Sequence, residues 1–145
     1  MHQSSVEDRW FRREFEAGRF PPAAFNHRAH VRLAYVYLTE HEAGNAYRMM
    51  RDALLYFLAR HGIDPSKYHE TLTRAWILAV AHFMENTPAA ESSDVFIERN
   101  PRMLDAKIMM THYSAAVLFS DEARARFVEP DLDPIPLIPR RGVDT

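Results

Sequence analysis

Two short clusters of histidine residues are the parts of this sequence best suited to catalysis or metal binding. His27 and His30 stand three residues apart in the first cluster, and His69 precedes Glu70 in the second. Neutral imidazole binds divalent metal ions, and it also exchanges protons near neutral pH. The two clusters therefore predict either a metal site or an acid/base site.

The metal hypothesis follows from helical spacing. On a helix, residues three apart lie on one face, so His27 and His30 can share a ligand. His69 on a second, packed helix would complete a three-histidine set, which is a known layout for catalytic zinc, and an added carboxylate suits iron or manganese. We therefore predict a divalent metal ion (Zn, Fe or Mn) held by His27, His30 and His69. Glu70 would be a fourth ligand or a base acting on metal-bound water.

The second cluster partly resembles the zinc-binding helix of zincin proteases. That helix has a second histidine four residues after the first, where this chain has Thr73. A metalloprotease is therefore not inferred. Trp76 shares the face of His69, and Arg74 is placed to bind an anionic group of a substrate.

A further group of polar residues, Asp105 with His112 to Ser114, either lines the same cavity or caps short helices. Glu129 and Asp131 stand between prolines, and they either cover the pocket or pair with nearby arginines. Surface pairing is the favoured reading. The predicted catalytic residues are Tyr68, Glu70, Arg74, His112 and Tyr113.

These residues favour a small metal-dependent enzyme that performs a hydrolytic or lyase-like reaction on a small anionic molecule. An iron enzyme that uses oxygen is open if the carboxylate joins the ligands. One alternative is a non-enzymatic module that binds a small ligand or a metal. Another is a metal-free enzyme in which His69 and Glu70 or His112 act as acid and base.

Composition narrows the class of protein. The chain has 145 residues, 47% of them hydrophobic and 26% charged, which predicts one folded domain over residues 1–139 and a loose end at 140–145. There is no cysteine, so metal ligands must be nitrogen or oxygen atoms. A net charge of -2 gives no cationic field for nucleic acid. Without a signal-like start or a long apolar run, we expect a cytoplasmic protein that binds a small molecule and no membrane, with a homodimer left open.

The positions of the functional residues depend on the helices that carry them. Apolar periodicity and capping residues predict helices from about residue 5 to 17, 26 to 40, 45 to 61 and 67 to 85, the last being the most apolar and central. Shorter helices follow, one capped by Ser93 and one by Ser120. Prolines make residues 129–139 an extended tail, with Leu132, Ile135 and Leu137 as its expected anchors. The predicted fold is an all-α bundle of about four main helices with short C-terminal helices.

Four motifs together resemble a family of small uncharacterised bacterial proteins that are all-helical. The motifs are Asn26-His27-x-x-His30, Tyr68-His69-Glu70-Thr71, His112-Tyr113-Ser114 and Glu129-Pro130-Asp131-Leu132. The resemblance runs from about Phe15 to Pro136. It implies that both histidine clusters, the tyrosine-serine pair and the acidic proline segment belong to one design. It carries no activity, substrate or cofactor.

Overall fold

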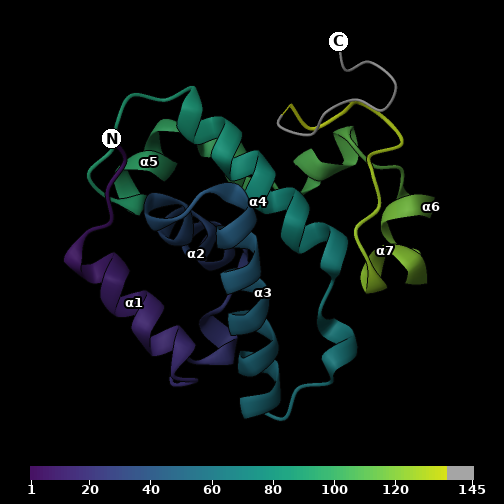
Figure 1. Cartoon of the computed structure of the whole chain (residues 1–145), viewed down its shortest axis with the longest axis horizontal. Coiled ribbons are helices and arrows are strands. Elements are labelled where there is room, and N and C mark those ends of the chain that lie inside the picture. Colours follow the sequence, from purple (N-terminus) through teal and green to yellow (C-terminus); the bar gives the residue numbers. More distant parts are fainter. Residues whose placement is uncertain (137–145) are drawn as a thin grey trace.

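The computed structural model describes residues 1–136, and these residues form an all-α bundle without a strand (Figure 1). The predicted fold class is therefore confirmed. Helices α2, α3 and α4 pack against one another, and α1 packs across α2 and α3. The four long helices are α1 (Val6–Glu16), α2 (His27–Glu40), α3 (Ala43–Arg60) and α4 (Glu70–Glu85).

The core of the bundle is built around α2 as much as around α4. Five successive residues of α2, Leu33 to Tyr37, have no exposed surface. A helix that is buried all round its axis lies inside a bundle. From the sequence, α4 alone was expected to be the central helix because it is the most apolar. Helix α2 is equally central, because its two tyrosines are buried as well. Tyr35 donates a hydrogen bond to the carbonyl of Gln3 at 2.7 Å, and Tyr37 donates one to Glu16 at 2.6 Å, which satisfies both hydroxyls.

Several helix ends match the sequence prediction. Ser5 forms a capping box with Asp8 at the start of α1, and the side chain of Asn26 accepts a hydrogen bond from the backbone of Ala29 at 2.9 Å. Gly18 and Gly62 follow α1 and α3 with φ of 74° and 65°, values that glycine adopts without strain.

Other helix boundaries differ from the prediction. Helix α3 begins at Ala43, two residues before its expected start, and Glu42 is its cap. Helix α5 (Ser93–Arg99) is capped by Ser92, because the hydroxyl of Ser93 is already used in a hydrogen bond to Asp8. Helix α4 was expected to begin near Lys67, but it begins at Glu70, with His69 as its cap. The chain before it forms the 3-10 turn η2 (Pro65–Lys67), followed by extended backbone at Tyr68.

Asp8 is a buried carboxylate that connects three helices. It is 1% exposed and accepts hydrogen bonds from the amides of Ser5 and Ser93, from the Ser93 hydroxyl and from Nε of Arg32. Burial works to raise the pKa of Asp8, but the hydrogen bonds from Ser93, Ser5 and Arg32 outweigh it and lower that pKa. Asp8 therefore anchors α1 to α2 and α5 in its ionised form.

The C-terminal third consists of short elements laid against this body: η3 (Pro101–Leu104), η4 (Ala106–Thr111), α6 (Ala115–Leu118) and α7 (Asp121–Ala125). Helix α7 packs on α4 (Figure 1). The proline-rich segment after α7 contains no helix in its described part, residues 126–136, and the backbone bends at 131–133. The amide of Leu132 donates to the carbonyl of His112 at 3.0 Å, and Ile135 is fully buried, whereas Leu132 is half exposed. Leu137, expected as a third anchor, and the end at 140–145 lie outside the described residues.

The helices of residues 1–136 are too short or too polar to cross a lipid bilayer.

Candidate functional site

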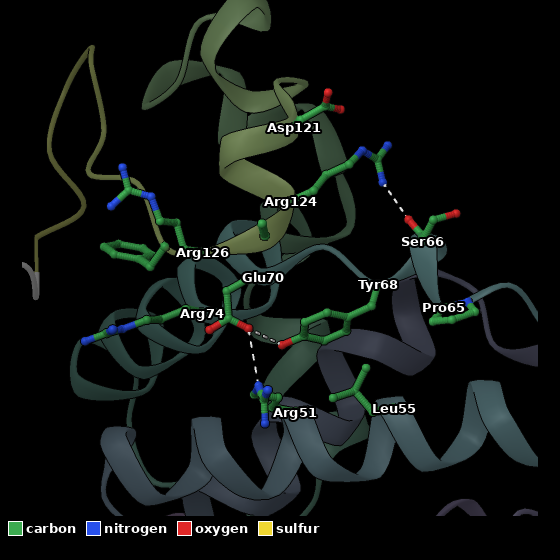
Figure 2. A pocket seen from close by; sticks show the side chains of 12 residues that line it. Arg51, Leu55, Pro65, Ser66, Tyr68, Glu70, Arg74, Asp121, Arg124 and Arg126 are labelled. Carbon is green, nitrogen blue, oxygen red and sulfur yellow. Dashed lines mark hydrogen bonds and ion pairs between the residues drawn. The ribbon is translucent and has the colours of Figure 1, made fainter.

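A cavity of about 510 Å³ lies between α3, the start of α4 and α7 (Figure 2). We call it the arginine-lined cavity because four guanidinium groups and two carboxylates line it. The chain as a whole has a formal net charge of -2, so this cavity is cationic on an acidic protein. The charged residues are Arg51, Arg74, Arg124, Arg126, Glu70 and Asp121.

Glu70 is the most enclosed charged group of the cavity. It is the first residue of α4, and its side chain is 14% exposed. Its carboxylate accepts a hydrogen bond from the hydroxyl of Tyr68 at 2.7 Å and a second from the hydroxyl of Tyr47. Nε of Arg51 lies 3.6 Å from the Oε1 atom of Glu70. Figure 2 shows the side chains of Arg51 and Tyr68 pointing toward the Glu70 carboxylate. The carboxylate is thus held by two residues of α3 and by Tyr68 from the segment before α4.

The electrostatic state of Glu70 differs from that of an ordinary surface glutamate. Burial raises its pKa, and the positive charge of Arg74 opposes that rise without cancelling it. A carboxyl group whose pKa is raised exchanges a proton more readily near neutral pH than an exposed one does. The position of Glu70 therefore suits acid/base chemistry.

The guanidinium groups are held in different ways. Arg74 stacks on aromatic rings, its Cζ atom 4.7 Å from the ring centre of Phe127 and 5.5 Å from that of Tyr47. No carboxylate within residues 1–136 comes close enough to Arg74 for an ion pair. Arg124 donates to the carbonyl of Ser66 at 3.2 Å. Arg74 can therefore accept an anionic ligand without breaking an ion pair.

Three of the residues predicted to be catalytic meet in this cavity, namely Tyr68, Glu70 and Arg74. The other two hold the C-terminal segment. Tyr113 is fully buried and donates to the carbonyl of Val128 at 2.5 Å, and burial raises the pKa of its hydroxyl. Nδ1 of His112 donates to the carbonyl of Asp133 at 2.7 Å. Neither residue lines the arginine-lined cavity.

The polar residues beside them serve as caps. Asp105 accepts from the amide of Lys107 at 2.9 Å, and Ser114 caps α6. Asp131 accepts from the amide of Ser114 at 2.8 Å, and hydrogen bonding to the side chain and to the amide of Ser114 lowers the pKa of Asp131. The expected pairing of Asp131 with an arginine is therefore replaced by a bond to backbone, and Arg126 pairs with Glu122 in its own helical region.

His69 uses both of its ring nitrogens within the protein. Nδ1 accepts from the amide of Leu72 at 3.1 Å, and Nε2 donates to the carbonyl of Leu118 at 2.7 Å. This fixes a neutral ring, and burial lowers the pKa of His69, which agrees with that state. Nδ1 has its lone pair in a hydrogen bond and Nε2 carries the proton, so no lone pair is left for a metal ion.

His27 and His30 share one face of α2, as their spacing predicts, with ring centres 6.4 Å apart. Nε2 of His27 donates to the carbonyl of Met103 at 2.8 Å. Within residues 1–136, no group of three or more histidine, aspartate or glutamate side chains is arranged to hold a metal ion. The predicted set of His27, His30 and His69 therefore has no support in this geometry, and Glu70 faces the arginines.

Several residues of the site were not predicted from the sequence, and two of them contact Glu70 directly. These two residues are Tyr47 and Arg51. They stand four residues apart in α3, which places them on one helical face. That spacing of a tyrosine and an arginine was the available signal, but only the packing of α3 on α4 brings the pair to Glu70.

Comparisons with protein-family models, with curated proteins and with solved structures gave no match. The class of the protein is therefore defined by its own fold and cavity. Its described residues form an all-α protein with a cationic cavity built around a partly buried glutamate.

Proposed function

We propose that the protein binds a small anionic molecule in the arginine-lined cavity and that Glu70 exchanges a proton with it. The observation that carries this proposal is the position of the Glu70 carboxylate, bonded to Tyr68 and 3.6 Å from Arg51 in a cavity lined by four arginines. The proposal corresponds to the metal-free acid/base enzyme that the sequence analysis gave as an alternative. A centre on His69 would require that ring to give up its bonds to Leu72 and Leu118.

The chemistry follows from the charges. Guanidinium groups bind carboxylate or phosphate through two parallel N–H donors, so Arg51 and Arg74 would hold the anionic group. Glu70 would then remove a proton from the carbon next to that group, breaking the C–H bond and becoming a neutral carboxylic acid. The arginines would stabilise the negative charge that develops on the ligand. This is the proton-transfer step of a lyase-like reaction.

The binding half of the proposal is tested by calorimetry with inorganic phosphate and with succinate. Arg51→Gln should weaken binding by roughly tenfold, since one charge-assisted contact is lost. Arg9→Gln is the matched control, because Arg9 is exposed on α1 and lies outside the cavity. Equal affinities for wild type, Arg51→Gln and Arg9→Gln, or no binding of either anion, would contradict an anion site here.

The chemical half is tested by deuterium exchange. Small carboxylates are incubated with the protein in D₂O, and NMR follows the loss of the proton on the carbon beside the carboxylate. Glu70→Gln should reduce the exchange rate by at least about 100-fold while anion binding persists. A chelator should leave the rate unchanged. Exchange that is insensitive to Glu70→Gln, or that stops on chelation, would overturn the assignment.

A further inference from the structure

A second cavity, of about 480 Å³, lies beside α2 and α4 and shares no lining residue with the arginine-lined cavity. Its walls are mainly apolar, and Phe25, Trp76 and Leu118 are among them. A neighbouring cavity of about 350 Å³ shares Phe25, His30 and Leu72 with it. His30 thus borders two apolar spaces, and we call the larger one the His30 cavity.

His30 differs from the other two histidines of the predicted metal set. His27 uses one ring nitrogen in a bond to Met103, and His69 uses both. The ring nitrogens of His30 have no hydrogen-bond partner among residues 1–136, and they stay accessible from the cavities. Burial, helped by repulsion from His27, lowers the pKa of His30 to about 4, so the ring is neutral at physiological pH. Because the His30 nitrogens are open to the cavities, a ligand or water there can form the hydrogen bonds that the protein does not supply.

We infer that the His30 cavity binds a small neutral aromatic molecule that carries a hydroxyl group, with the hydroxyl bonded to His30 and the ring against Phe25 and Trp76. A neutral imidazole offers one donor and one acceptor, and a hydroxyl can bond to either of them. Aromatic and aliphatic walls favour a flat apolar ring. An anion gains little, because His30 is uncharged and the cation of the lining, Lys107, is solvent-exposed.

The test compares phenol with toluene, which has nearly the same shape but no hydroxyl. Trp76 lines the cavity, and the chain's other tryptophan, Trp10, is exposed on α1, so a Trp10→Phe variant reports on Trp76 alone by fluorescence. Phenol should give a saturable change with a dissociation constant on the order of 1 mM or tighter. It should bind roughly tenfold more tightly than toluene, because toluene leaves His30 unsatisfied.

The variant His30→Leu should still bind toluene but should lose the preference for phenol. If His30→Leu fails to fold, Ala106→Phe serves instead, since Ala106 is an exposed residue of the cavity wall and a larger side chain there should exclude phenol. Ala116→Phe, on the exposed face of α6, is its control.

Three results would overturn the inference. The first is the absence of saturable binding of either compound. The second is that His30→Leu still prefers phenol to toluene, or that Ala106→Phe still binds phenol. The third is tighter binding of benzoate than of phenol, which would show an anion site. Arg51→Gln should not alter phenol binding, so this inference can fail while the proposed anion site holds.

Discussion

Two carboxylates, Asp8 and Glu70, sit in the first turn of a helix and are largely buried, yet their surroundings differ in kind. Asp8 receives four hydrogen bonds, two of them from backbone amides, and its pKa is lowered. Glu70 receives its bonds from tyrosine hydroxyls at the edge of a cavity, and its pKa is raised. Asp8, whose carboxylate is fully hydrogen-bonded by the protein, serves as a structural anchor. Glu70, which has fewer hydrogen bonds and borders a cavity, can change its protonation state.

The largest effect is expected for Asp8→Ala. The substitution leaves the guanidinium of Arg32 and the buried donors of Ser93 without their acceptor, so the free energy of unfolding should fall by about 3–5 kcal/mol. Urea denaturation at pH 7 measures it. Asp94→Ala is the control, because Asp94 is 70% exposed and pairs with Arg28 at the surface, where the loss should stay below about 1 kcal/mol. Similar losses for both variants would remove the distinction between anchor and surface pair.

The second prediction concerns pH. Because the folded pKa of Asp8 is lowered, its stabilisation is complete above the unfolded value of about 3.9 and is lost as the pH falls through the folded pKa. The urea midpoint of wild type should therefore drop in acid more steeply than that of Asp8→Asn. Parallel curves for the two proteins between about pH 6 and pH 3 would show that Asp8 has an ordinary pKa.

A smaller effect is expected for Tyr68→Phe, which removes the hydroxyl that donates to Glu70 at 2.7 Å. The unfolding free energy should fall by about 1 kcal/mol, a typical value for one hydrogen bond. Because that bond favours the charged carboxylate, the pKa of Glu70 should rise further. NMR titration of the Glu70 side chain measures the shift. Tyr56→Phe, at an exposed tyrosine, should change neither quantity, and a downward shift in Tyr68→Phe would contradict the assigned direction of the bond.

The smallest effect on stability is expected for Glu70→Gln. A raised folded pKa means that ionised Glu70 is less favourable in the folded protein than in the unfolded chain, so a neutral side chain removes a penalty above the unfolded pKa. Weaker bonds from the tyrosines offset that gain. The unfolding free energy at pH 7 should change by less than about 1 kcal/mol. A loss as large as that of Asp8→Ala would make Glu70 a second anchor and would weaken its proposed role in proton transfer.

The sequence predicted those parts of the molecule that depend on neighbouring residues. Helix caps such as Asn26 and Ser120 act within three residues of themselves, so their bonds to Ala29 and Ala123 could be predicted. The proximity of Tyr68, Glu70 and Arg74 also follows from local spacing.

The remaining features depend on contacts between distant segments. The carbonyl groups of Met103 and Leu118, which bind His27 and His69, belong to the C-terminal elements and carry no side-chain signature. No pattern of residue types identifies a backbone carbonyl as a hydrogen-bond partner of an imidazole. In the sequence, His27 and His69 therefore could not be distinguished from metal ligands. The capping role of His69 was hidden for the same reason, since Ser, Thr, Asp and Asn are the usual caps.

The contribution of α7 to the arginine-lined cavity sets an order of events during synthesis. A nascent chain that has emerged as far as α4 already contains Arg51, Glu70 and Arg74, but Arg124 and Phe127 are added fifty or more residues after Arg74. Chains leave the ribosome N-terminus first. The helical body can therefore assemble while one wall of the cavity is still missing, and the growing polypeptide gains its complete cavity only after α7 has been added.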